Sequence, residues 1–172
     1  MKVLITGGVK SGKSRYALTL AEELWPKEEC SGDRYFLATG TPFDDEMKER
    51  IRIHKEERDS SFITIEEPIN IHEPLKNRCI VDDITVWISN LFYHTKDGEM
   101  EDILHRLIRR MEADLEDIIL VTNETGMGNI PMDPHVRQYN RLLGLANGML
   151  ASAVDRMYLM VSGIPLLVKG RQ

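Results

Sequence analysis

Near the start of the chain stands the stretch Gly7-Gly8-Val9-Lys10-Ser11-Gly12-Lys13-Ser14, which matches the pattern G-x-x-x-x-G-K-[ST]. An apolar run at residues 2–5, typical of a buried strand, precedes it, and a helical pattern over residues 13–24 follows. Glycines between a strand and a helix let backbone N–H groups curl around phosphate oxygens. The positive end of the helix dipole adds to the attraction for an anion. The stretch therefore predicts a phosphate loop in an α/β fold.

Each polar side chain of such a loop has an expected partner. Lys13 should reach the β- and γ-phosphates of a nucleoside triphosphate, and the Ser14 hydroxyl should ligate Mg²⁺. A second metal ligand is expected at the end of a buried strand, where the run Ile80-Val81-Asp82 places a carboxylate. We therefore expect Ser14 and Asp82 to meet across the sheet around Mg²⁺.

The rest of the chain alternates short apolar runs with helical patterns, which predicts a P-loop NTPase-like fold with a mostly parallel sheet and helices on both faces. We expect one nucleotide-binding domain over residues 1–172, with the strand at 62–66 near an edge because it alternates apolar and polar residues. The other expected strands are 34–38, 79–82, 118–122, 157–161 and a short one at 166–168. The other expected helices are 44–58, 86–93, a stripe from 103 to 115 and a long helix from 136 to 153.

Composition narrows the class of protein further. The 172 residues carry a net charge of −6, with scattered Lys and Arg, so no large basic surface for nucleic acid is expected. No apolar run approaches the roughly 18 residues of a membrane span. The two cysteines, Cys30 and Cys79, have no metal-like spacing. These features favour a cytoplasmic protein with reduced cysteines.

One predicted helix carries an unusual set of charges. Arg50, His54 and Arg58 are four residues apart and share one helix face. Flanking cations lower the pKa of an imidazole and favour its neutral, nucleophilic form. A neutral His54 could attack an α-phosphate while the arginines hold the displaced pyrophosphate. The alternative is a solvated helix in which His54 packs against its apolar neighbours.

Together, these motifs resemble the bifunctional adenosylcobinamide kinase / adenosylcobinamide-phosphate guanylyltransferase family of cobalamin biosynthesis. The resemblance covers essentially the whole chain. Beyond the phosphate loop and the histidine helix, three segments carry it: Tyr35-Phe36-Leu37-Ala38-Thr39, Val121-Thr122-Asn123-Glu124-Thr125-Gly126-Met127-Gly128 with Pro131, and Val161-Ser162-Gly163-Ile164-Pro165.

The resemblance implies two reactions and a set of nucleotide contacts. A nucleoside triphosphate, ATP or GTP, phosphorylates a hydroxyl of adenosylcobinamide; GTP then guanylylates His54, and GMP passes to adenosylcobinamide phosphate. The family is typically homotrimeric. The implied nucleotide-binding positions are Gly7, Gly8, Val9, Lys10, Ser11, Gly12, Lys13, Ser14, Thr39, Gly40, Thr41, Lys55, Glu56, Glu57, Arg58, Glu66 and Asp82.

The chain departs from the family pattern at Asp83, where many members carry Cys, and at Asn140-Arg141 and Gly148. Other functions compatible with the phosphate loop are a small-molecule kinase without guanylyl transfer and an ATPase domain acting on a protein partner. A non-catalytic GTP-binding module is disfavoured, because the strings D-x-x-G and N-K-x-D do not occur.

Overall fold

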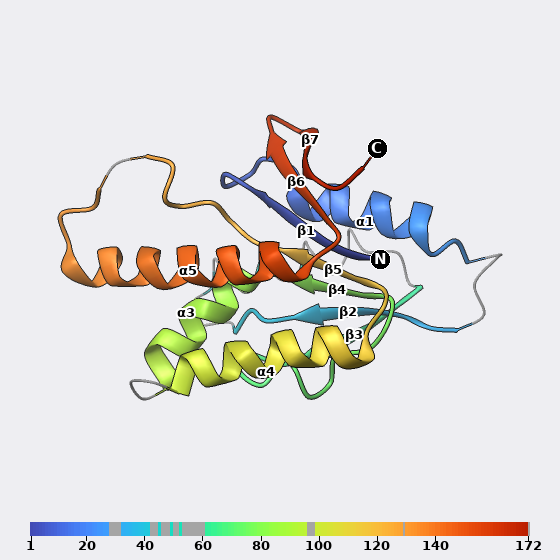
Figure 1. The fold of residues 1–172 in the computed structure, drawn as a ribbon, viewed down its shortest axis with the longest axis horizontal. Helices are drawn as coiled ribbons and strands as arrows, with labels where there is room; N and C mark the ends of the chain where they lie inside the picture. Colours follow the sequence, from blue (N-terminus) through green and yellow to red (C-terminus); the bar gives the residue numbers. More distant parts are fainter. Residues whose placement is uncertain are drawn as a thin grey trace.

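The computed structural model describes residues 1–27, 32–41, 45, 49, 52, 61–95, 99–128 and 130–171. In these parts of the chain, seven strands form one sheet in the order β3-β2-β4-β5-β1-β6-β7 (Figure 1). Every neighbouring pair is parallel except β6 and β7, so the expected mostly parallel sheet is confirmed. The strands are β1 (Lys2–Gly7), β2 (Arg34–Ala38), β3 (Phe62–Glu66), β4 (Cys79–Asp82), β5 (Ile118–Val121), β6 (Arg156–Val161) and β7 (Ile164–Lys169).

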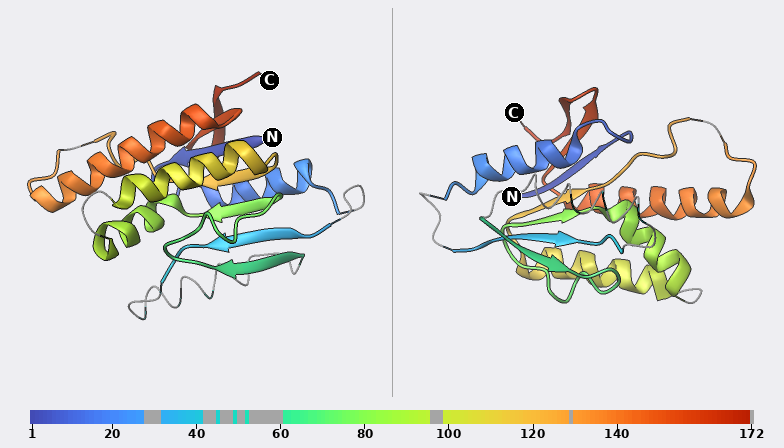
Figure 2. Two further views of the ribbon diagram at one scale, coloured as in Figure 1. Left: turned by 60° about the horizontal axis from the view of Figure 1, so that its bottom comes forward. Right: turned by 180° about the vertical axis from the view of Figure 1, so that it is seen from behind.

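Helices cover both faces of this sheet. On one side lies α1 (Lys13–Leu24), and on the other lie α3 (Ile84–His94), α4 (Glu99–Asp114) and α5 (Pro134–Ala153) (Figures 1 and 2). The helices α3 and α4 both pack against α5. Within the described ranges, no helix combines the length and the apolarity needed to cross a bilayer.

Strand β1 shows why the sheet has two apolar faces. Val3 and Ile5 belong to the cluster beneath α1, whereas Leu4, between them, belongs to the cluster beneath α3, α4 and α5. All three side chains are fully buried. Because successive side chains of a strand point to opposite faces, a strand covered by helices on both sides must be apolar at every position.

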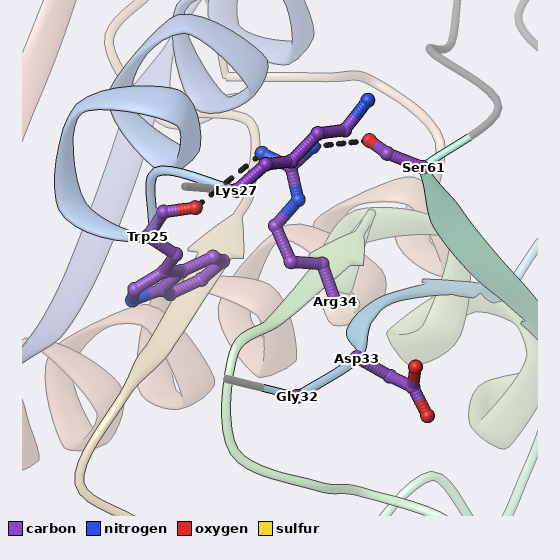
Figure 3. Close-up of a pocket in the computed structure, with 6 residues that line it drawn as sticks. All are labelled: Trp25, Lys27, Gly32, Asp33, Arg34 and Ser61. Atoms are coloured by element: carbon purple, nitrogen blue, oxygen red, sulfur yellow. Dashed lines mark hydrogen bonds between the residues drawn. The ribbon is translucent and has the colours of Figure 1, made fainter. Parts of the chain in front are cut away.

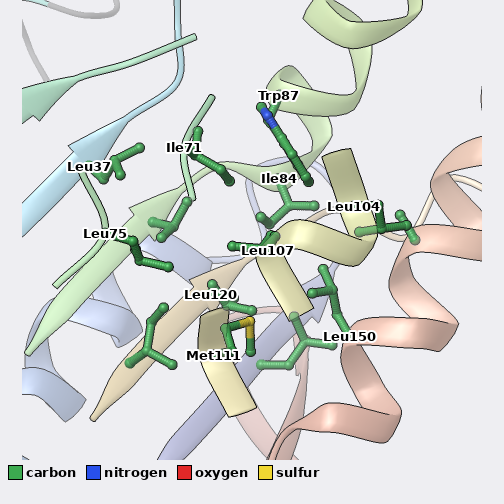
Figure 4. Close-up of a cluster of buried hydrophobic side chains, with 14 of the residues drawn as sticks. Leu37, Ile71, Leu75, Ile84, Trp87, Leu104, Leu107, Met111, Leu120 and Leu150 are labelled. Atoms are coloured by element: carbon green, nitrogen blue, oxygen red, sulfur yellow. The ribbon is translucent and has the colours of Figure 1, made fainter. Parts of the chain in front are cut away.

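The larger core lies between the sheet and helices α3, α4 and α5 (Figure 4). Full burial of an aliphatic side chain contributes roughly 1.5–3 kcal/mol, so this layer supplies much of the stabilisation. The buried indole of Trp87 donates its N–H to the Ile69 carbonyl at 2.7 Å, which satisfies its one polar group. The side chains labelled in the figure are Leu37, Ile71, Leu75, Ile84, Trp87, Leu104, Leu107, Met111, Leu120 and Leu150.

The predicted limits of α1, β2, β3 and β4 agree with the structure. Helices α4 and α5 and strand β6 begin earlier than expected, and two further differences have identifiable reasons. Helix α3 begins at Ile84, not at residue 86, because the Asp83 carboxylate accepts a hydrogen bond from the Val86 N–H and caps the first turn. Strand β7 extends over six residues because it pairs with β6 along its length. The predicted helix at 44–58 lies mainly outside the described residues; Asp45, Glu49 and Arg52, which are described, are helical.

A pocket of about 190 Å³ lies at the amino ends of β2 and β3, far from the phosphate loop (Figure 3). Arg34 is its central residue, and its buried guanidinium lies 4.6 Å from the centre of the Phe62 ring. It donates hydrogen bonds to the Trp25 carbonyl and to the Ser61 hydroxyl. Because Trp25 caps the carboxyl end of α1, the cation complements the negative end of the helix dipole. We assign Arg34 a structural role.

Candidate nucleotide-binding site

The phosphate loop adopts a backbone conformation that would be strained for most residues other than glycine. Gly7 and Gly12 have φ angles of 148° and 92°, and a Cβ on Gly7 would lie 2.6 Å from the Met160 carbonyl oxygen. Gly12 is the N-cap of α1 and supplies no side-chain hydrogen bond to the first turn. The first N–H groups of α1 therefore remain available to an anion, as the sequence pattern predicts.

Lys13 folds back over the loop. Its ammonium donates a hydrogen bond of 2.6 Å to the Gly8 carbonyl, and only 7% of the residue is exposed. Holding a lysine charge with so little water is costly unless hydrogen bonds or anions compensate it. The ammonium thus lies over the loop, where a β- or γ-phosphate would be bound.

The two predicted metal ligands come together from distant parts of the sequence. The Ser14 hydroxyl donates to the Asp82 carboxylate at 3.3 Å, joining the first turn of α1 to the end of β4. Strand β5 separates β4 from β1, so this contact is made across the carboxyl edge of the sheet. Hydroxyl and carboxylate oxygens are hard ligands of the kind Mg²⁺ prefers. The pair has the chemistry of a magnesium site.

Replacing Asp82 by asparagine is expected to raise the Mg²⁺ concentration needed for half-maximal activity by about 10- to 100-fold, because the site loses its negative charge. A magnesium titration of nucleotide turnover measures the effect. Glu112→Gln, on an exposed position of α4, is the control and should leave the titration unchanged. An unchanged titration for Asp82→Asn would contradict the assignment and point to the adjacent Asp83.

The remaining predicted contacts line the same edge of the sheet. Thr39 is fully buried and donates its hydroxyl to the Asp83 carbonyl at 2.8 Å, which ties the end of β2 to the end of β4. Gly40 and the exposed Thr41 follow directly. Glu66 ends the edge strand β3, in register with Ala38 on β2. Predicted site residues His54, Lys55, Glu56, Glu57 and Arg58 lie outside the described residues.

A buried polar network behind this edge was not predicted. Asn147 of α5, 6% exposed, accepts a hydrogen bond from the Thr122 hydroxyl at 2.8 Å and donates to the Asn123 carbonyl at 3.0 Å. The Thr85 hydroxyl accepts from the Asn123 N–H at 2.7 Å. The sequence signal was the pair Thr122-Asn123, two polar residues directly after a buried strand. The network immobilises the chain as it leaves β5.

Tyr139 belongs to the same network. Its hydroxyl donates to the Thr85 carbonyl at 2.9 Å. Burial raises the pKa of Tyr139, and the nearby negative charge of Asp83 raises it further. The phenol therefore stays protonated at neutral pH and acts as a hydrogen-bond donor.

Replacing Asn147 by alanine is expected to lower the free energy of unfolding by about 2 kcal/mol, because the buried Thr122 hydroxyl and the Asn123 carbonyl lose their partner. Urea denaturation measures the change. Ser152→Ala, at an exposed position on the same helix, should shift stability by no more than about 0.5 kcal/mol. Equal shifts for the two variants would show that the network contributes nothing specific.

The turn between β6 and β7 packs on the phosphate loop from the other side. Gly163 donates its N–H to the Ser11 carbonyl at 3.0 Å, and a Cβ on Gly12 would lie 3.4 Å from the Gly163 Cα atom. Ser162 and Gly163 have φ angles of 51° and 85°, as a tight hairpin turn requires. This contact gives a structural reason for residues 161–165, one of the segments that carry the family resemblance.

Comparison with known proteins connects this geometry to one family. Residues 3–168 match the family model described as cobinamide kinase / cobinamide phosphate guanyltransferase. The chain belongs to this family. Both reactions in the family name are group transfers, so this member of the cobinamide kinase / cobinamide phosphate guanyltransferase family is a transferase. The family resemblance seen in the sequence is confirmed.

Curated members of this cobinamide kinase / guanyltransferase family match the chain over almost their full length. The bifunctional adenosylcobalamin biosynthesis protein CobP of Pseudomonas aeruginosa is 36% identical, over 99% of this chain and 98% of its own. The bifunctional adenosylcobalamin biosynthesis protein CobU of Escherichia coli is 30% identical, over 98% of this chain and 100% of its own. The matched region therefore spans the phosphate loop, β4 and the segment after β5.

Proposed function

We propose that this protein phosphorylates adenosylcobinamide with a nucleoside triphosphate and then transfers GMP from GTP to the resulting adenosylcobinamide phosphate. The observation that carries the proposal is the match along residues 3–168 to a family named for both reactions. The contact of Ser14 with Asp82, beside a buried Lys13, supports it, because phosphoryl transfer needs a metal ion and a cation at the phosphates.

In the proposed site the loop from Gly7 to Ser14 holds the triphosphate, and Ser14 and Asp82 hold Mg²⁺. When bound, the metal neutralises charge on the phosphates. Lys13 donates hydrogen bonds to the β- and γ-phosphate oxygens. The further nucleotide contacts are Thr39, Gly40, Thr41, Lys55, Glu56, Glu57, Arg58 and Glu66.

For the second reaction we propose a covalent intermediate on His54. The imidazole nitrogen attacks the α-phosphorus of GTP; the N–P bond forms as the bond to pyrophosphate breaks. A phosphate oxygen of the corrinoid then attacks the same phosphorus and releases the imidazole. The spacing of Arg50, His54 and Arg58 supports this step, since arginines bind pyrophosphate bidentately.

We also propose that the chain is one domain, that it works in the cytoplasm, and that it assembles as a homotrimer, as the family resemblance implies. Its partner molecule is then the corrinoid substrate and not a nucleic acid. Light scattering of the purified protein tests the assembly.

The decisive experiment is incubation of the protein with adenosylcobinamide, Mg²⁺ and ATP or GTP, followed by mass analysis of the corrinoid. The proposal expects a phosphate adduct first and a GDP adduct when GTP is present. A phosphate adduct that never advances with GTP would leave a kinase without guanylyl transfer. Nucleotide turnover that is independent of any corrinoid would favour an ATPase domain and contradict the proposal.

A further inference from the structure

The segment after β5 lies against the phosphate loop, and the functions assigned so far give it no chemical role. The Glu124 N–H donates to the Gly7 carbonyl at 3.1 Å, and the Thr122 N–H donates to the Ile5 carbonyl at 3.0 Å. The pairing of β5 with β1 thus continues past the end of the strand. Glu124 is thereby held beside the first residue of the phosphate loop.

The same region holds the lysine of the loop. Lys13 donates to the Gly8 carbonyl, while Glu124 is bonded to the carbonyl of the adjacent Gly7. The Glu124 backbone and the Lys13 ammonium are thus bonded to two successive residues, whose Cα atoms are about 3.8 Å apart. A γ-phosphate held by Lys13 would therefore lie near the backbone that carries Glu124.

The peptide group that joins Asn123 to Glu124 is hydrogen-bonded through both its carbonyl and its N–H. The preceding Asn123 has its N–H bonded to the Thr85 hydroxyl and its carbonyl bonded to the Asn147 amide. On the other side of this peptide, the Glu124 N–H is bonded to Gly7. The point from which the Glu124 side chain extends is therefore fixed relative to the phosphate loop.

The other carboxylates near the loop already have partners. Asp83 accepts from the Val86 N–H with one oxygen and from the Asn123 amide with the other, and Asp82 accepts from Ser14. The half-buried Glu124 carboxylate makes no hydrogen bond or ion pair with the described part of the chain. Across its own loop it faces Gly126, on which a Cβ would lie 3.8 Å from one carboxylate oxygen. Both of its oxygens remain available to a substrate.

We propose that Glu124 is the general base of the phosphoryl transfer, and this assignment rests on the proposed function. The acceptor hydroxyl oxygen attacks the γ-phosphorus, the new O–P bond forms and the bond to the β-phosphate oxygen breaks. The hydroxyl proton passes to the Glu124 carboxylate and then to water, and the nucleoside diphosphate leaves. Transfer of GMP to a corrinoid phosphate needs no such base, because a phosphate oxygen is already ionised.

Glu124→Gln tests the assignment, since it removes the base and keeps the N–H that binds Gly7. With adenosylcobinamide and ATP we expect kcat to fall about 100-fold, with KM for ATP unchanged. With prepared adenosylcobinamide phosphate and GTP, guanylyl transfer should stay within about threefold of the parent. Glu124→Asp, which keeps a carboxylate, should recover part of the kinase rate. Glu116→Gln, exposed just before the opposite end of β5, is the matched control and should change neither reaction.

Any of the following results would overturn this role. Kinase turnover of Glu124→Gln within threefold of the parent would show that no base is needed at this position. Equal losses in both reactions, or a raised KM for ATP, would show that Glu124 merely holds the loop. Affinity for a fluorescent ATP analogue reports that each variant is folded. A parent protein without kinase turnover would contradict the proposed function itself, and the assignment with it.

Discussion

Lys13→Ala is expected to reduce both phosphoryl transfer and guanylyl transfer by at least about a thousandfold, a loss typical of removing a preorganised cation from a phosphate site. The Lys13 ammonium is nearly buried over the loop and donates to the Gly8 carbonyl, so it is already held where the phosphates would bind. Initial rates of both reactions, measured separately with adenosylcobinamide and with its phosphate, give the effect.

The fold should survive this change. Lys13 is the first residue of α1, and alanine is a good helix former. Removing a poorly solvated charge is also not expected to lower the free energy of unfolding. Circular dichroism and the thermal midpoint of the variant should therefore resemble those of the parent. Lys76→Ala, an exposed lysine over the Tyr35 ring, is the matched control and should retain full activity. Near-normal kinase turnover in Lys13→Ala would show that the phosphate-loop assignment is wrong.

His54→Asn is expected to abolish guanylyl transfer while sparing part of the kinase activity. Phosphorylation of a hydroxyl needs no covalent enzyme intermediate, whereas the proposed transfer of GMP passes through the imidazole. GTP radiolabelled at the α-phosphate should label the parent protein, and GTP labelled at the γ-phosphate should not. The label should be released by acid and resist base, as a phosphoramidate does.

His72→Asn is the comparison variant, because His72 is a histidine outside the predicted helix and part of it is buried, which lowers its pKa. It should keep both the label and the guanylyl transfer. Label that survives in His54→Asn would exclude this residue as the nucleophile, and loss of label in His72→Asn would make that histidine the candidate. Loss of both activities in His54→Asn would instead indicate a role in binding GTP.

Much of the fold could be predicted because its signals are local. The limits of β2, β3 and β4 agree with the apolar runs that predicted them, and α1 agrees with its helical pattern. A strand that is buried on both faces must be apolar throughout, so it is easily recognised in a sequence. The start of α3 was missed by two residues because it depends on the hydrogen bond between the Asp83 carboxylate and Val86, which a periodic pattern does not reveal.

The candidate site was only partly predictable. The geometry of the phosphate loop could be predicted from the order of its glycines, Lys13 and Ser14, because the loop consists of eight consecutive residues. Glu124 and Gly163 could be recognised only as parts of segments that carry the family resemblance. Their contacts with Gly7 and Ser11 join residues more than a hundred positions apart, which a sequence pattern does not reveal. Such contacts depend on strand order, which the alternation of strands and helices does not specify.

By itself, therefore, the sequence determined the phosphate loop, the alternation of strands and helices, and the family, each from residues that are neighbours in the chain or from similarity along it. Only the tertiary structure decided that β5 lies between β4 and β1. That order lets Asp82 reach Ser14 across one edge and leaves the Glu124 N–H bonded to Gly7. The Glu124 carboxylate makes no hydrogen bond or ion pair with a described residue. The physical reason is that parallel strands collect their carboxyl ends at one edge of the sheet, and the strand order decides which residues meet there.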